Sequence, residues 1–194
     1  MPRPKEFDPA QALETAMQAF WERGYEATSI QDLVDRTGVQ KASLYATFGD
    51  KRALFRRALE HYQAQGYAKL DAALNHGASP LAALRAHVRE MVEGTCSASS
   101  PRGCLWVKAA LERAPHDPEI AALMQAHVRR VERAFRDALS RARERGELAK
   151  NTDVEAKARA LYGATLGLHV YGTLMPKEKP LQQAANQILG ILDS

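Results

Sequence analysis

Cysteine is scarce in this chain, and long apolar runs are missing. Only 2 of its 194 residues are cysteine, too few for the disulfide framework of a small secreted domain. No apolar run approaches the roughly 18–20 residues that a membrane-spanning helix needs. The opening segment MPRPKEFDPA lacks the apolar stretch that a secretory signal contains. We therefore expect a cytoplasmic protein that has no membrane partner.

The sequence also lacks the motifs of common enzymes. It contains no glycine-rich phosphate loop, no Ser-His-Asp or Cys-His set at a recognisable spacing and no clustered metal ligands. Cys96 and Cys104 frame the segment CSASSPRGC, which has neither a second cysteine pair nor a histidine nearby. Asp117 and Glu119 look like an unremarkable surface pair. We expect no catalytic activity, no cofactor and no metal; turnover of a bound ligand would favour an enzyme instead.

Positive charge is modest overall but concentrated in one segment. The 27 lysines and arginines exceed the 23 acidic residues by only 4, which does not by itself indicate an acidic partner. Between residues 36 and 57, however, a single acidic residue, Asp50, stands among six basic ones. These are Arg36, Lys41, Lys51, Arg52, Arg56 and Arg57. The segment predicts a local basic patch, with an ordinary solvated helix face as the alternative.

Apolar residues recur at helical spacing almost throughout, as Leu13, Met17 and Phe20 do at i, i+4 and i+7. No alternating run of β-branched residues indicates a strand. The sequence therefore predicts an all-α protein of about nine helices. Expected helix ends are Gly24, Gly38, Gly49 and Gly146, and the serine-rich segment 97–103 is expected to be a loop. Expected helix starts are Thr28 (in a capping-box pattern with Gln31), Asp50, Ser79-Pro80, Asp117-Pro118 and Asp153.

The stretch GVQKASLYATFGDK (38–51) predicts the second helix of a helix-turn-helix. Leu44 and Phe48, one turn apart, would pack inward. The outward residues would be polar groups that can bond base edges or phosphates, namely Gln40, Lys41, Ser43 and Thr47. In this motif the second helix enters the major groove of DNA, which explains why such a short helix has a polar front.

The segment TSIQDLVDRTGVQKASLYATFGDKRALF (28–55) resembles the DNA-binding signature of TetR-type (AcrR-like) transcriptional regulators. Ala42 stands where many members have glycine, and it is still small. The resemblance covers about residues 8–62. It implies a three-helix DNA-binding domain at 1–62 and an effector-binding and dimerisation domain at 63–194.

The resemblance also implies roles for individual residues. Thr28 would bond a phosphate at a helix N-terminus, Tyr45 and Thr47 would touch the sugar-phosphate backbone, and Lys51 would hold a phosphate. For Tyr45 the alternative is a half-buried surface aromatic, and for Gln40 and Lys41 it is plain solvent exposure. The full set of expected DNA-binding residues is Thr28, Ser29, Gln40, Lys41, Ala42, Ser43, Tyr45, Thr47, Phe48 and Lys51.

Two C-terminal segments are the expected dimer surface. The stretch ALYGATLGLHVYG (160–172) contains Gly163, Gly167 and Gly172, which would permit close helix approach. The last helix has a wide apolar stripe. Its members are Leu181, Ala184, Ala185, Ile188, Leu189 and Leu192. Core packing within one subunit is the alternative for both segments.

The middle helices would enclose a pocket for a small-molecule effector. Its expected lining is Met91, Cys104, Trp106, Met124, His127 and Tyr171, with Phe135 as a further candidate, and plain core packing is the alternative for each. Cys104 follows Arg102 and begins a predicted helix, which would lower the pKa of its thiol. A cluster of arginines at 129, 130, 133 and 136 is expected to be a solvated face.

Together these features predict a ligand-responsive repressor. It would bind a pseudo-palindromic operator in double-stranded DNA as a homodimer, and a small-molecule effector would release it. Two alternatives stay open: a regulator that senses oxidants or electrophiles through Cys104, and a helical module that binds protein rather than DNA.

Overall fold

The computed structural model describes residues 7–75, 77, 79–97, 103–175 and 177–193. Within them the chain forms nine α-helices, one short 3-10 helix and no strand, so the predicted all-α class is confirmed. The α-helices are α1 (Pro9–Arg23), α2 (Ile30–Thr37), α3 (Lys41–Phe48), α4 (Lys51–Asn75), α5 (Pro80–Ser97), α6 (Leu105–Glu112), α7 (Pro118–Glu144), α8 (Val154–Leu174) and α9 (Glu178–Leu189). The 3-10 helix is η1 (Gly190–Leu192). No described helix combines the length and apolarity that crossing a bilayer requires. Most of the predicted loop at 97–103 lies outside the described residues.

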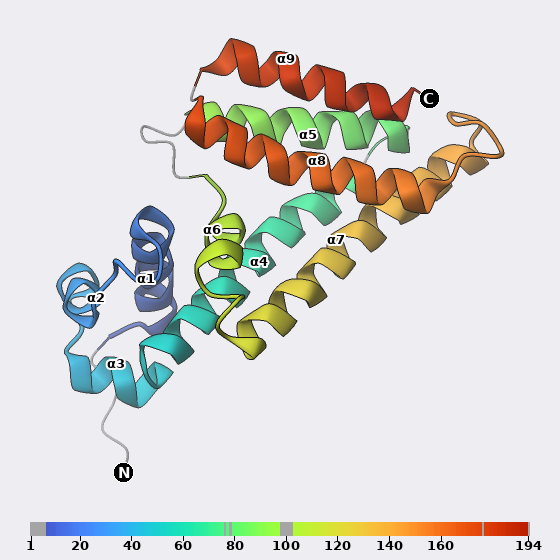
Figure 1. Ribbon diagram of the computed structural model, residues 1–194. Helices are drawn as coiled ribbons and strands as arrows, with labels where there is room; N and C mark the ends of the chain where they lie inside the picture. The colour runs from blue at the N-terminus through green and yellow to red at the C-terminus, as the bar shows by residue number, and fades with distance from the viewer. Residues whose placement is uncertain (1–6, 76, 78, 98–102, 176, 194) are drawn as a thin grey trace.

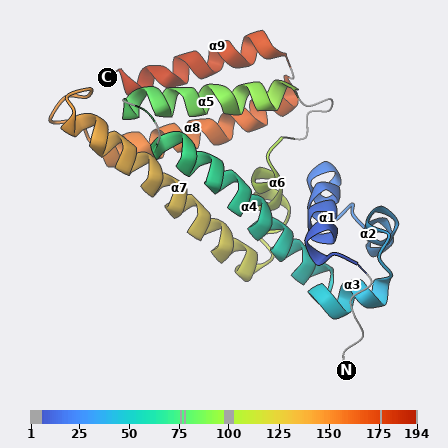
Figure 2. The same cartoon turned by 180° about the vertical axis from the view of Figure 1, so that it is seen from behind.

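The helices gather into two groups, one at each end of the molecule, and two long helices connect the groups. Helices α1, α2 and α3 gather around the start of α4 at one end, and α5, α8 and α9 pack together at the other (Figure 1). Helices α4 and α7 run side by side between the two ends, as the view from behind also shows (Figure 2). Helix α6 lies between them and contacts α1, α4, α7 and α8.

Each end of the molecule has its own core of buried side chains. The N-terminal core joins α1–α3 to the first half of α4 through residues such as Phe20 and Leu44, and it also includes Leu105 of α6. The distal core joins the second half of α4 to α5, α7, α8 and α9 through residues such as Leu84 and Leu139. The predicted domain boundary at residue 62 falls inside the uninterrupted α4 and stays a prediction. Because α4 contributes side chains to both cores, a movement of α4 would change the packing in both.

Most predicted helix ends coincide with the observed ones. Gly38 ends α2 in the left-handed conformation, with φ of 68° and ψ of 9°, and this sharp turn sets α3 against α2. Asp50 Oδ1 accepts from Ala53 N at 2.7 Å, and Ser79 Oγ accepts from Ala82 N at 3.0 Å. Asp117 and Asp153 also accept from the first N–H groups of their helices. Local side-chain chemistry thus decides where these helices begin and end.

The start of α2 differs from the prediction by one residue. Ser29, and not Thr28, is the N-cap, and its partner in the capping box is Asp32. Ser29 Oγ accepts from Asp32 N at 3.0 Å, and Asp32 Oδ2 accepts from Ser29 N at 2.8 Å. Thr28 lies one residue too early: its buried hydroxyl points back to the end of α1 and donates to Gly24 O at 2.6 Å.

Candidate nucleic-acid interface and ligand cavity

Helix α3 is held by its back and exposed along its front. Leu44 is fully buried and Phe48 is 5% exposed, and both pack in the N-terminal core. Gln40, Lys41 and Tyr45 are exposed. The Lys41 ammonium lies 5.5 Å from the centre of the Tyr45 ring, so the two side chains share one face. A polar surface on a rigidly anchored short helix has the shape of a DNA-reading element.

The remaining predicted contacts on α3 are also accessible. Ala42 is exposed, and Ser43 and Thr47 are half-buried at the edges of the same face. The small side chain of Ala42 leaves the centre of this face open. Contact of these residues with DNA stays a prediction.

Two of the expected DNA-binding residues are buried instead. Phe48 belongs to the N-terminal core, so its expected role at DNA is wrong; it is the inward residue of its helical turn. Thr28 has no exposed surface, and its backbone N–H donates to Tyr25 O at 3.3 Å. The exposed Ser29 occupies the N-terminus of α2 in its place, and this is the group through which a phosphate could be approached.

The predicted basic patch is smaller than its sequence indicates. Arg36 pairs with Glu22 at 2.6 Å, and Arg56 pairs with Glu60 at 2.6 Å. Arg52 is also paired, with acidic residues of α7. The members of the patch that form no ion pair with any described residue are Lys41, Lys51 and Arg57. The positive charge free to meet a phosphate is therefore concentrated at α3 and the first turns of α4.

Lys51 is positioned by an aromatic ring. Its ammonium lies 4.2 Å from the centre of the Tyr25 ring, and the Arg113 guanidinium lies 4.5 Å from the same ring. Both cations are attracted to the electron-rich face of the phenol. Lys51 is thus half-buried and held at the end of α3, where the resemblance places a phosphate contact.

A buried carboxylate, which was not anticipated, joins this region to α7. Asp117 is 2% exposed at its side chain, accepts from Arg52 Nε at 2.7 Å and lies 3.3 Å from Arg113 Nη2. The Arg52 guanidinium holds the pKa of the Asp117 carboxyl well below its usual range. Expecting Asp117 on the surface was therefore wrong. Only its role as an N-cap was visible in the sequence, because Arg52 is 65 residues away.

Helix α6 is fastened to the end of α1 by three further contacts. Lys108 Nζ donates to Trp21 O at 2.7 Å, at the carboxyl end of α1. Trp21 Nε1 donates to Gly103 O at 2.8 Å, and Tyr25 N donates to Glu112 Oε2 at 2.8 Å. Any displacement of α6 therefore pulls on the helix that supports α2 and α3.

A cavity of about 530 Å³ opens between α6, α7 and α8. Trp106, Met124 and His127 line it as expected, and the Trp106 and His127 rings stack at 4.4 Å with an interplanar angle of 7°. The other lining residues are Val107, Ala110, Leu111, Ala114, Ala121, Gln125, Val128, Arg129, Tyr162, Leu166, Gly167 and Val170. The volume and apolar lining are typical of a small-molecule site.

Four residues expected at the cavity do not line it. Phe135 is buried in the distal core, and Met91 packs against that core from α5. Tyr171 is 38% exposed on α8. Cys104 is buried at the start of α6, behind the cavity wall. Helical spacing predicts that these residues face inward, but it does not distinguish a residue in a cavity wall from one in a filled core.

The Cys104 thiol is less acidic than expected. Its Sγ accepts from the Tyr62 hydroxyl at 3.7 Å, and burial raises its pKa. The backbone N–H groups of Val107 and Trp106 act in the opposite direction, as expected at a helix start, but burial has the larger effect. Burial and a raised pKa both disfavour a reactive thiolate at Cys104, and the thiol-sensing alternative stays a prediction. The side chain of Cys96, and Arg102 altogether, lie outside the described residues.

Helix α8 presents an exposed face of small and apolar residues. Gly163 and Gly167 are exposed and face open space, and Val170 and Leu174 continue the row. Gly172 instead faces the interior, because a Cβ there would lie 2.7 Å from Thr95 Cγ2 and 3.1 Å from Leu181 Cδ2. Its expected place on the dimer surface is therefore wrong.

The apolar stripe of α9 is largely internal. Leu181, Ala185, Leu189 and Leu192 are buried in the distal core of their own subunit. The exposed side of α9 is polar, with Gln182, Gln183, Asn186 and Gln187. The other two members of the stripe, Ala184 and Ile188, are half-buried, so a contact of α9 with a second copy stays a prediction.

Two family models match the chain. "Bacterial regulatory proteins, tetR family" matches residues 12–58, and "Tetracyclin repressor-like, C-terminal domain" matches residues 80–188. The first covers most of α1, all of α2 and α3, and the beginning of α4. The second covers α6 and the helices that form the cavity.

Relatives of known sequence and of known structure are similar over nearly the whole chain. The uncharacterised HTH-type transcriptional regulator YezE of Bacillus subtilis is 36% identical over 194 residues, 100% of both chains. The HTH-type transcriptional repressor ComR of Escherichia coli is 32% identical, over 96% of this chain and 90% of ComR. A cysteine mutant of the regulator CifR, solved with 26-base-pair double-strand operator DNA, superposes with a TM-score of 0.87 at 34% identity, covering 96% of this chain and 97% of that one.

Proposed function

The chain belongs to the TetR family of transcriptional regulators, and we propose that it is a homodimeric repressor that a small-molecule effector releases from its operator. Members of this family act by binding DNA and not by catalysis. The observation that carries the proposal is the anchored α3, with Leu44 buried behind and Lys41 exposed in front. The repressor ComR and the operator complex of CifR support it by similarity.

DNA binding would use α3 as the groove-reading helix. Gln40, Lys41 and Ser43 lie at its N-terminal end, which is the end that reaches base edges in a helix-turn-helix. Tyr45 and Thr47 would touch the backbone from the edges of the same face. Base contacts would set the sequence preference, and phosphate contacts would set the affinity and its salt dependence.

A dimer would bring two such helices to one operator. The exposed face of α8 around Gly163 and Gly167 would let a second copy approach closely, because a Cβ at either glycine would meet no atom within 4 Å. The polar side of α9 would flank this contact. Two α3 helices related by a two-fold axis would read half-sites ~34–36 Å apart, one turn of DNA.

Effector binding would act on DNA binding through α6. A molecule in the cavity touches Trp106 and Val107, on the helix that Lys108 and Glu112 fasten to α1 and the following turn. A small displacement of α6 would therefore change the orientation of α1–α3 relative to the rest of the subunit. Release requires that the effector bind this second arrangement more tightly than the DNA-bound one.

A gel-shift titration tests the proposal. The full-length protein is mixed with a labelled fragment from upstream of its own gene and challenged with unlabelled fragment or with scrambled DNA of equal length. We expect a retarded band that only the unlabelled fragment competes away, and that weakens steeply as salt is raised. Equal competition by both DNAs would contradict the proposal. Salt-insensitive capture of a protein would favour the helical interaction module instead.

A further inference from the structure

We propose that the effector is an amphipathic organic anion, whose apolar body fills the cavity between α6, α7 and α8 and whose carboxylate or similar group is bound by Arg129 and Arg133. This inference rests on the proposed function, because it names the chemical class of the effector. It depends on three features: an almost uncharged cavity, an adjoining hollow rich in arginine, and the residue that the two share.

The cavity itself offers almost no charge. Apolar side chains and glycine make up most of its wall, together with Gln125 and the ring of Tyr162. Burial, and then the charge of Arg130, lower the pKa of His127 to about 4, so this ring is neutral at neutral pH. Among the described lining residues only Arg129 is charged, and it lies at the edge of the cavity.

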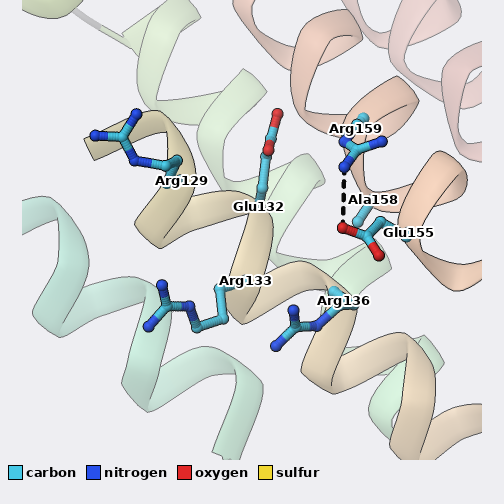
Figure 3. A pocket seen from close by; sticks show the side chains of 7 residues that line it. All are labelled: Arg129, Glu132, Arg133, Arg136, Glu155, Ala158 and Arg159. Carbon is cyan, nitrogen blue, oxygen red and sulfur yellow. Dashed lines mark hydrogen bonds and ion pairs between the residues drawn. The ribbon is translucent and has the colours of Figure 1, made fainter. Parts of the chain in front are cut away.

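A second hollow of about 240 Å³ continues from Arg129 along α7 (Figure 3). Four arginines and two glutamates line it with Ala158. The charged residues are Arg129, Glu132, Arg133, Arg136, Glu155 and Arg159. On α8, Arg159 is paired with Glu155 at 2.9 Å, and on α7, Arg136 is paired with Asp137 at 2.8 Å. Among the described residues, neither Arg129 nor Arg133 has an ion-pair partner.

The spacing of these two arginines favours a bound anion. Arg129 and Arg133 lie one helical turn apart, and like charges at this spacing repel each other. A carboxylate between them would remove that repulsion and accept charge-assisted hydrogen bonds from guanidinium groups, which suit its planar shape. Of the two glutamates, Glu155 is exposed and already paired with Arg159, whereas Glu132 is half-buried, so the four arginines leave the hollow with a net positive charge.

The two hollows adjoin at Arg129, and we treat them as one groove along α7 and α8. Arg129 lines both. On α8, Tyr162 lines the apolar part while Ala158, one turn away, lines the basic part. Along α7, the stretch from Met124 to Arg133 is roughly 14 Å long at 1.5 Å per residue. The groove therefore fits a molecule of moderate length with one apolar and one anionic end.

Two fluorescent dyes of nearly identical shape provide the test. Anilinonaphthalene sulfonate carries an anionic group, and phenylnaphthylamine has the same rings without it. Titrated against the full-length protein, the anionic dye is expected to bind roughly tenfold more tightly, the gain from one charge-assisted contact. Raising the salt concentration should weaken binding of the anionic dye but not of the neutral dye.

Variants locate this preference in the groove. Arg129→Gln should reduce binding of the anionic dye to the level of the neutral dye and leave the neutral dye unchanged. Arg130→Gln is the matched control, since Arg130 lines neither hollow and stacks 3.5 Å from the Tyr67 ring centre. Ala110→Trp fills part of the apolar cavity from an exposed position and should weaken both dyes.

Several results would overturn the inference. Equal affinity for both dyes, or no effect of Arg129→Gln, would exclude an anionic end group at this site. No effect of Ala110→Trp would show that the dyes bind elsewhere. A change in oligomeric mass in Arg129→Gln would assign the arginines to a second copy of the chain. Operator binding is measured on the same samples. If the operator is still bound, a negative dye result contradicts only the effector class; if the operator is not bound, the proposed function itself fails.

Discussion

Arg52 binds Asp117 at two points, with Nε 2.7 Å from Oδ2 and Nη2 2.8 Å from Oδ1. The contact joins the first turn of α4, which follows α3, to the N-cap of α7, a helix whose later residues line the cavity. It fastens the start of α4 to the start of α7, whose first turn also contributes Ile120 to the N-terminal core. Its contribution to the fold can be separated from that of the cap.

Asp117→Ala should destabilise the protein more than loss of a cap alone. The change removes the α7 cap and also leaves Arg52 without its buried partner. We expect a loss of about 2 kcal/mol in the free energy of unfolding, measured by urea denaturation.

Asp153→Ala is the matched control, because Asp153 caps α8 in the same way but forms no ion pair with a described residue. It should cost about 1 kcal/mol. Equal losses in the two variants would mean that the Arg52 contact adds nothing.

Stability should fall in mild acid because partial burial keeps His127 and His169 in their neutral form. Burial is the larger cause that lowers the pKa of His127 and of His169 to about 4 from 6.5. Below pH 6.5 the unfolded chain therefore binds more protons than the folded chain. The contribution of these neutral histidines to the free energy of unfolding is complete above pH 6.5 and is lost as pH falls towards 4. Each histidine should contribute a loss of roughly 1–2 kcal/mol by about pH 5.

Urea denaturation at about pH 7 and pH 5 measures this loss. His169→Gln should reduce the difference between the two pH values, whereas His116→Gln, at an exposed position, should not. A pH dependence unchanged by His169→Gln would contradict a buried neutral ring.

The Cys104 thiol should react slowly in the folded protein. Its burial both blocks reagents and raises its pKa, so the thiolate is rare at neutral pH. Alkylation by iodoacetamide, followed by peptide mass spectrometry at Cys104, should be much slower in buffer than in concentrated urea. Rapid alkylation of the native protein would favour the thiol-sensing alternative.

Gly163→Leu should weaken the dimer. The exposed glycine on α8 leaves room for a second helix, and a leucine side chain would hold the two helices apart. Sedimentation of the variant at micromolar concentration should show monomer where the parent chain is dimeric. Gly66→Leu, at another exposed helical glycine with open space around it, should leave the mass unchanged. A dimeric Gly163→Leu variant would place the interface elsewhere.

The sequence predicted what short-range chemistry decides. Gly38 ends a helix and Asp50 begins one through contacts within a few residues, and both were identified correctly. The inward position of Leu44 and the exposure of Lys41 follow from helical spacing alone. These local signals were sufficient for the all-α class and for the exposed face of α3.

What the sequence could not predict depends on contacts between distant segments. Thr28 and Ser29 are both good caps by residue type, but the Thr28 hydroxyl points back to the end of α1 and donates to Gly24 O. An apolar stripe such as that of α9 looks the same whether its own subunit or a partner covers it. The pairing of Arg52 with Asp117 has no sequence signature at all.

Fluorescence anisotropy with operator and scrambled DNA at several salt concentrations decides whether the exposed face of α3 reads DNA. The parent chain is compared with Lys41→Ala and with Lys150→Ala, which removes an equal charge at an exposed site in the turn between α7 and α8. We expect Lys41→Ala to lose most of its preference for the operator over scrambled DNA, while Lys150→Ala keeps that preference. If both variants discriminate as well as the parent chain, α3 is not the reading helix.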